Sequence, residues 1–114
     1  MGEHEIEPPV STLAFRILLT LSDGVKHGYS ISKELEASFD GLKVRFGTLY
    51  GLLKQMHTDG WIAEVESPRG DDPRRRYYRL TARGRRVGQA EAQRLATLVR
   101  EARARKMLPY AETS

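Results

Sequence analysis

The sequence has 114 residues, which suits one domain with a packed core, and its 19 Lys and Arg exceed its 15 Asp and Glu to give a net charge of +4. Because Glu3, Glu5 and Glu7 make the N-terminal tail acidic, positive charge concentrates in the second half of the chain and favours an anionic partner. The lack of cysteine excludes disulfides and thiolate zinc sites, and without a long apolar run or a signal-peptide pattern we expect a cytoplasmic protein.

The first expected helix follows a tail at residues 1–9 that ends in two prolines. Its apolar residues recur at helical spacing on one side, while Phe15 and Leu19 load the other side, until Asp23 and Gly24 end the pattern. A helix that is apolar nearly all round must be covered on two faces, either by the domain core or by a second subunit. We assign Phe15 and Leu19 to a dimer interface.

A second, short amphipathic helix is predicted to open near residues 27–29 and to stop at Asp40 and Gly41. Its apolar stripe consists of Ile31, Leu35 and Phe39, and its polar residues face outward.

The third helix has the clearest periodicity. Its buried stripe is spaced i, i+3, i+4 and i+7 and consists of Leu49, Leu52, Leu53 and Met56. The opposite face carries Tyr50 and Lys54, and Gly60 supplies the left-handed residue that ends the helix.

A basic β-hairpin is expected next, with strands at residues 61–67 and 74–80 around a turn rich in Pro, Gly and Asp. Residues 69–86 contain eight arginines around a tyrosine pair. Tyr77 and Tyr78 should point to opposite faces of the strand, with Tyr78 in the core. A helix followed by a cationic hairpin is typical of a winged helix-turn-helix that holds a DNA duplex.

The last helix is expected to run from Thr81, its N-cap, to about Met107, with Pro109 closing it. Gly84 and Gly88 near its start indicate close packing against another helix. An apolar stripe farther along has nothing to cover it within so small a domain, so we expect a second copy to pack against Leu95, Leu98, Val99 and Ala102.

This order of elements predicts an α+β fold that is mainly helical, a winged helix-turn-helix with a C-terminal dimerisation helix. The expected parts are a flexible acidic tail at 1–9, a DNA-binding domain at 10–80, a dimerisation helix at 81–108 and a tail at 109–114.

Three motifs in this order resemble the PadR-like transcriptional regulators: HGYSISKEL at residues 27–35, GTLYGLLKQMHTDGWI at 47–62 and YRLTARG at 78–84. With a single C-terminal helix, the chain resembles the short subgroup of that family. The resemblance implies a homodimeric repressor whose terminal helices pair. In some members of the family a small molecule relaxes the affinity for DNA.

Two departures from the family pattern stand out. Arg45 and Phe46 replace the small polar residue and proline that many members carry, so the third helix lacks the usual hydroxyl cap and Arg45 is available to a phosphate. The terminal helix also lacks the tryptophans between which some relatives stack aromatic drugs, which argues against a pocket of that kind.

The candidate DNA contacts come from the helix-turn-helix and from the hairpin. Hydroxyl and ammonium groups of the third helix can reach base edges and phosphates, a glycine there permits close backbone approach, and an arginine at the hairpin tip suits a minor groove. The alternative is an ordinary solvated surface, with hairpin arginines paired to Asp71 and Asp72. The expected contacts are Tyr29, Ser30, Arg45, Gly47, Thr48, Tyr50, Lys54, Arg69, Arg74 and Arg76.

Other kinds of site have little support. His27 and His57 lack the further ligands that a zinc site needs, so we expect no bound metal. The sequence also has no nucleophile motif and no phosphate-binding glycine loop, so we expect no cofactor and no enzymatic activity. The main prediction is a dimer on a palindromic operator in double-stranded DNA, which a small-molecule effector could release. The alternatives are a protein-interaction module and a small-molecule sensor with its pocket between the first and last helices.

Overall fold

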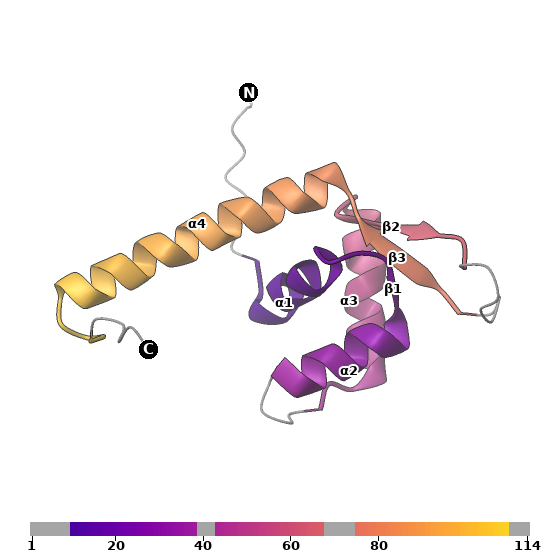
Figure 1. Cartoon of the computed structure of the whole chain (residues 1–114), viewed down its shortest axis with the longest axis horizontal. Coiled ribbons are helices and arrows are strands. Elements are labelled where there is room, and N and C mark those ends of the chain that lie inside the picture. The colour runs from indigo at the N-terminus through magenta and orange to yellow at the C-terminus, as the bar shows by residue number, and fades with distance from the viewer. Residues whose placement is uncertain (1–9, 39–42, 68–74, 110–114) are drawn as a thin grey trace.

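The computed structural model describes residues 10–38, 43–67 and 75–109. Three helices and a small sheet form the body of the molecule, and one long helix extends away from it (Figure 1). In chain order the elements are α1 (Thr12–Leu21), β1 (Lys26–His27), α2 (Gly28–Ser38), α3 (Phe46–Thr58), β2 (Ile62–Val65), β3 (Tyr77–Leu80) and α4 (Ala82–Ala104). The expected winged helix-turn-helix is therefore confirmed.

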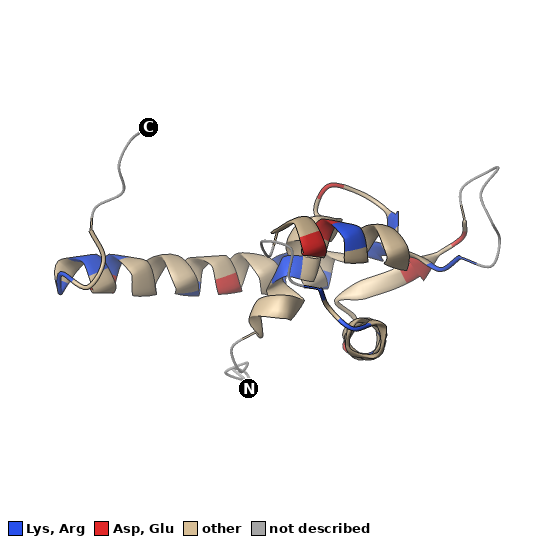
Figure 2. Cartoon of the chain, turned by 90° about the horizontal axis from the view of Figure 1, so that it is seen from below, with Lys and Arg blue, Asp and Glu red and all other residues tan. Residues whose placement is uncertain are grey.

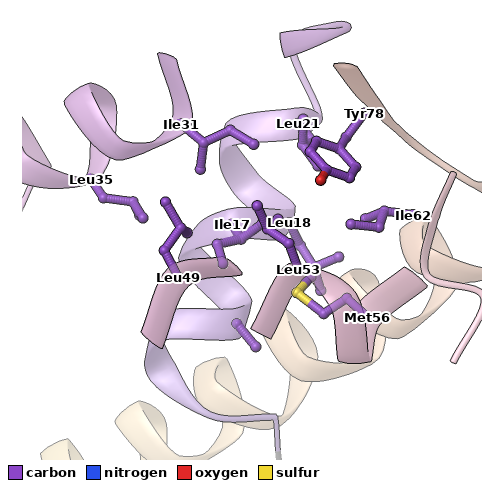
Figure 3. Close-up of a cluster of buried hydrophobic side chains, with 11 residues drawn as sticks. Ile17, Leu18, Leu21, Ile31, Leu35, Leu49, Leu53, Met56, Ile62 and Tyr78 are labelled. Carbon is purple, nitrogen blue, oxygen red and sulfur yellow. The ribbon is translucent and has the colours of Figure 1, made fainter. Parts of the chain in front are cut away.

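The core lies where α1, α2 and α3 meet the sheet (Figure 3). The predicted stripe of α3 is buried, with Leu52 only partly so, and Ile31 and Leu35 of α2 are buried beside it. Phe39, the third residue predicted for the α2 stripe, lies outside the described residues. Among the described residues, the largest fully buried side chains are Ile17, Leu21, Ile31, Leu35, Leu49, Leu53, Met56 and Ile62.

α1 is buried on one side only. Ser11 caps it, since its hydroxyl accepts a hydrogen bond of 3.1 Å from the N–H of Ala14. On the other side Leu19 is 52% exposed and Phe15 is only partly buried. The domain core thus covers one of the two apolar faces and leaves the other to solvent.

The three strands form an antiparallel sheet in the order β1-β3-β2. β1 was not predicted, because Lys26 and His27 show no strand periodicity and pair only with residues 77–78 far along the chain. Within the described residues the hairpin strands are also shorter than the predicted 61–67 and 74–80.

Both tyrosines of β3 are buried, whereas the sequence pattern predicts only Tyr78 in the core. Tyr78 belongs to the core, as predicted. Tyr77 is only 4% exposed, and the ring of His27 packs edge-on against its ring at 5.2 Å. His27 of β1 lies opposite Tyr77 in the β1–β3 register, so the side chain of a third strand packs on a ring that the hairpin alone would leave more exposed.

The start of α4 is tied to the hairpin. The hydroxyl of Thr81 accepts a hydrogen bond of 2.9 Å from the N–H of Gly84, which confirms the predicted N-cap. A Cβ at Gly84 would collide with the carbonyl of Trp61, whereas one at Gly88 would meet Leu18 at an ordinary 3.8 Å. Close packing therefore requires glycine at the first position only.

α4 ends at Ala104, earlier than the predicted Met107. Lys106 adopts a left-handed conformation with φ of 65°, its N–H donates to the carbonyl of Arg103, and the N–H of Met107 donates to the carbonyl of Ala102. These paired bonds are a Schellman motif, which closes the helix before Pro109 is reached.

Candidate nucleic-acid interface

α3 and the hairpin border a groove of about 390 Å³. Its lining brings together cations from both elements, a single carboxylate and an aromatic floor: Tyr50, Leu53, Lys54, His57, Glu64, Arg76 and Tyr78. Burial, above all, raises the pKa of Tyr78 above its ordinary value. The structure thus places predicted site residues Tyr50, Lys54 and Arg76 around one concave surface.

α3 begins without a side-chain cap. Arg45 occupies the N-cap with extended backbone and makes no capping hydrogen bond, as its residue type led us to expect. Its carbonyl still accepts the first helical bond, at 2.9 Å from the N–H of Leu49. The exposed Arg45 side chain therefore stands next to uncapped backbone N–H groups, which together attract an anion.

The outer face of α3 contains two glycines that the fold does not need. Gly47 and Gly51 are exposed, and a Cβ built on either of them meets no atom within 4 Å. Glycine costs a helix interior roughly 1 kcal/mol relative to alanine, so at least Gly51 is a loss of stability without internal compensation. Thr48 and Lys54 are exposed on the same helix.

Tyr50 is divided between packing and solvent. A Cβ on Gly28 would collide with the hydroxyl end of Tyr50, so the tyrosine lies directly against the first residue of α2. The ring is nevertheless 40% exposed and stacks on Phe46, with centroids 6.0 Å apart. Tyr50 therefore joins the two helices of the helix-turn-helix and also faces outward.

At the start of α2, Tyr29 and Ser30 differ in exposure. Tyr29 is 53% exposed, and the ammonium of Lys33 lies 5.5 Å from its ring centroid. The hydroxyl of Ser30 is only partly buried but lies 3.0 Å from Nε2 of His27, so it already has a polar partner within the domain.

The hairpin contributes one described arginine from the predicted set. Nη1 of Arg76 donates to Oε2 of Glu64 at 2.6 Å across the two strands. This hydrogen bond and the carboxylate charge raise the pKa of Arg76. Arg69 and Arg74 lie outside the described residues.

Sequence reasoning missed four residues of this surface. The comparison with the family pattern marks Phe46 only as a departure, although an aromatic residue off the buried stripe of a helix is a visible signal of an outward role. Arg75, whose Nη1 lies 3.1 Å from Nε2 of His27, depends on the fold for its position. His57 and Glu64 also line the groove only because the hairpin folds back beside α3.

A second candidate surface lies on α1 and α4. Leu19, Leu98 and Val99 are 52%, 46% and 37% exposed, and Leu95 and Ala102 are partly buried. A hollow of about 170 Å³ between the two helices is lined by Phe15, Leu18, Leu19, Ser22, Leu80, Gly84, Arg85, Gly88, Gln89 and Ala92. The predicted dimerisation residues are therefore on the partly or largely open sides of these helices.

Basic residues occur along α4 up to its free end and also at the hairpin end of the molecule (Figure 2). Among the described residues no helix is long and apolar enough to cross a bilayer. In the same part of the chain no three potential metal ligands gather.

Residues 17–90 match the transcriptional regulator PadR-like family. A comparison with curated protein sequences found no match. Among solved structures, a transcriptional regulator from Clostridium thermocellum superposes with a TM-score of 0.70 and 24% identity, covering 87% of this chain and 99% of that chain. A PadR family transcription regulator from Clostridium difficile has a TM-score of 0.70 and 23% identity, covering 82% of this chain and 97% of that chain.

A mutant of the E. coli regulator MarR complexed with operator DNA has a TM-score of 0.61 and 20% identity, covering 74% of this chain and 54% of that chain. Identities this low establish a shared fold and nothing further. The family match spans more than half of the sequence, and the family consists of transcription regulators, not enzymes. The chain belongs to the PadR-like family of transcriptional regulators.

Proposed function

We propose that the protein is a homodimeric repressor that binds a roughly palindromic operator in double-stranded DNA. α3 enters the major groove, and the α2 start and the hairpin contact the flanking backbone. The observation that carries this proposal is the outer face of α3, where Gly47 and Gly51 leave space that nothing in the domain fills. A helix that must approach a sugar-phosphate chain closely gains from such space.

The charges around α3 support the same partner. Arg45 at its start and Lys54 in its third turn are exposed cations, and Arg76 of the hairpin stands across the groove from Lys54. Neutralising DNA phosphates with such side chains releases condensed counterions and lowers the free energy of association. Arg69 and Arg74 extend the cationic set along the sequence of the hairpin.

The dimer is proposed from the exposed apolar residues of α1 and α4. α4 has 23 residues and is therefore about 35 Å long, and much of it lies beyond the body of the domain (Figure 1). If a second copy packs against this surface through a twofold axis beside α4, Leu19, Leu98 and Val99 become buried together. The resulting pair of α3 helices would read two half-sites about one DNA turn apart.

A titration with DNA at several salt concentrations tests the assignment. Lys54→Ala should weaken binding and reduce the slope of log K against log salt by about one unit, since one phosphate contact is lost. Arg105→Ala removes an equal charge at the far end of α4 and should leave the slope unchanged. If the wild-type protein does not bind duplex DNA even at low salt, the protein-interaction alternative is favoured.

A small-molecule effector is the second part of the proposal. The hollow between α1 and α4 holds about 170 Å³, which is below the roughly 300 Å³ of an ordinary ligand pocket, so a partner subunit has to complete it. A panel of small apolar compounds should include one that raises the melting temperature and lowers the affinity for DNA. If every compound leaves both quantities unchanged, that panel gives the effector no support.

A further inference from the structure

Phe46 is the first residue of α3 and is 58% exposed. It is one of the most exposed large apolar side chains of the described chain, yet it lies at the end of the helix that carries the outward glycines. An exposed phenyl ring keeps its apolar surface in water, which stabilises nothing in the isolated domain.

The helix itself has no need of phenylalanine at this position. Proline suits the first helical residue because its φ is fixed and its missing N–H would be unpaired anyway, and phenylalanine is a mediocre helix former. The ring of Phe46 meets that of Tyr50 at an interplanar angle of 29°, and Tyr50 is anchored on Gly28. The phenyl group is thus held in one place while remaining exposed.

The surroundings of Phe46 are cationic and polar. Arg45 precedes it, Gly47 and Thr48 follow it, and all three are exposed. A protein partner would match a phenyl ring with an apolar patch, but the exposed Arg45 and the uncapped N–H groups beside this ring at the start of α3 favour an anion. An anionic partner that also offers an apolar group fits both features, and duplex DNA offers such a group in its major groove.

That apolar group is the methyl on C5 of thymine. Cytosine has only a hydrogen on C5, and the purine edges in the major groove present hydrogen-bond donors and acceptors, so a phenyl ring placed against them would remove water without replacing its hydrogen bonds. 5-Methylcytosine carries the same methyl group at the same place. Resting on the DNA-binding function proposed above, we propose that Phe46 reads the C5 methyl of one thymine in each operator half-site.

The test begins with duplexes selected from unmethylated random DNA by the wild-type protein. One thymine should recur at the same position of both half-sites, and its replacement by uracil in one half-site should weaken binding about fourfold, the factor for one buried methyl group. Uracil at the other thymines should have a smaller effect. A cytosine at that position should bind more tightly when it carries a 5-methyl group.

The variant Phe46→Ala should bind the thymine and uracil duplexes equally well, whereas Phe46→Leu, which keeps an apolar side chain, should retain part of the preference. Val25→Ala, a truncation of another exposed apolar residue, should leave the thymine preference unchanged. The circular dichroism and melting temperature of each variant establish that the domain remains folded.

Two failures can be told apart. If wild-type protein selects and binds duplexes, but Phe46→Ala discriminates thymine from uracil as well as wild type does, the role of Phe46 is wrong and DNA binding stands. The role of Phe46 is equally wrong if the selected half-sites share no thymine. If wild-type protein binds no duplex at all, the proposed function itself has failed.

Discussion

At the scale of single residues, the glycines of this chain separate into those that the fold requires and those that it does not. Gly84 touches the backbone of Trp61, whereas Gly51 faces open space from the middle of α3. The two positions give opposite expectations for the same substitution. Comparing them distinguishes stability from function.

Gly51→Ala should raise the free energy of unfolding by about 1 kcal/mol, because alanine is the better helix former and meets no obstacle. The same variant should bind DNA more weakly, because the added methyl occupies space proposed for the sugar-phosphate chain. Gly84→Ala should instead lose about 1–3 kcal/mol through the collision with Trp61. Chemical denaturation and a DNA titration measure both effects. Unchanged DNA affinity in Gly51→Ala would remove the main support for the proposed interface.

Glu91 is a charged residue inside the junction of α4 with the N-terminal segment. It is only 5% exposed, and its Oε1 accepts from the N–H of Val10 at 3.3 Å and from Nε of Arg94 at 3.0 Å. A second bond of 2.6 Å joins Nη2 of Arg94 to Oε2. The bond from Arg94 is the largest cause that lowers the pKa of Glu91 below its ordinary value of 4.5, and burial acts against it.

Because this pKa is lower in the folded state, the stabilisation from Glu91 is fully present above pH 4.5 and is lost as the pH falls through the folded value. Glu91→Gln should therefore melt at a lower temperature than wild type at neutral pH, with a loss of about 1–3 kcal/mol. The difference should shrink as the pH is lowered. Melting curves between pH 7 and pH 3 test this, and a gap that widens in acid would contradict it.

At the scale of elements, the hairpin positions Arg76, the residue before β3, through a contact with Glu64 of β2. Glu64 lies opposite Tyr78 in the β2–β3 register, and its carboxylate holds Arg76 beside the groove. Both side chains are substantially exposed, so the ion pair adds little to stability. On the proposed DNA interface, Glu64 would compete with a DNA phosphate for the guanidinium of Arg76.

Glu64→Gln should bind DNA more tightly than wild type, with a salt slope steeper by about one unit, because Arg76 becomes fully available. Glu66→Gln is the control, since it removes an equal charge from an exposed position just after β2 but leaves the partner of Arg76 in place. Any gain in affinity that comes only from weaker repulsion between the protein and DNA should appear in this variant too. In a background of Arg76→Ala the additional gain from Glu64→Gln should vanish. Equal gains in both backgrounds would show that Glu64 acts only at long range.

At the scale of the whole molecule, α4 extends the apolar surface of α1 beyond the domain. Leu98→Asp places a charge in the proposed dimer seam and should convert dimers to monomers. These monomers should bind the operator poorly, because a palindromic site is bound more tightly by two linked DNA-binding domains than by one. Met107→Asp is the matched control, since that residue follows the helix and is 83% exposed. Sedimentation velocity measures the oligomeric state. Dimers that persist in Leu98→Asp would exclude this seam.

Much of this fold followed from the sequence because the relevant interactions are local. The apolar spacing of α3, the N-cap at Thr81 and the left-handed stop at Gly60 involve residues within one or two turns of each other. The three motifs at residues 27–35, 47–62 and 78–84 likewise indicated the family. Residues on the exposed sides of α1 and α4 followed from the same periodicity.

Only the tertiary structure decided what distant segments do to each other. β1 forms because Lys26 and His27 pair with the edge of β3. Glu91 accepts a hydrogen bond from the N–H of Val10, which is 81 positions away in the sequence, and the strand register brings Arg76 to Glu64. The exposure of Phe46 and its ring contact with Tyr50 also came from the structure, because residue spacing alone does not predict either of them. Periodicity records which face of an element is apolar, but the contacts between elements depend on how the chain closes long loops. That closure is a property of the whole fold.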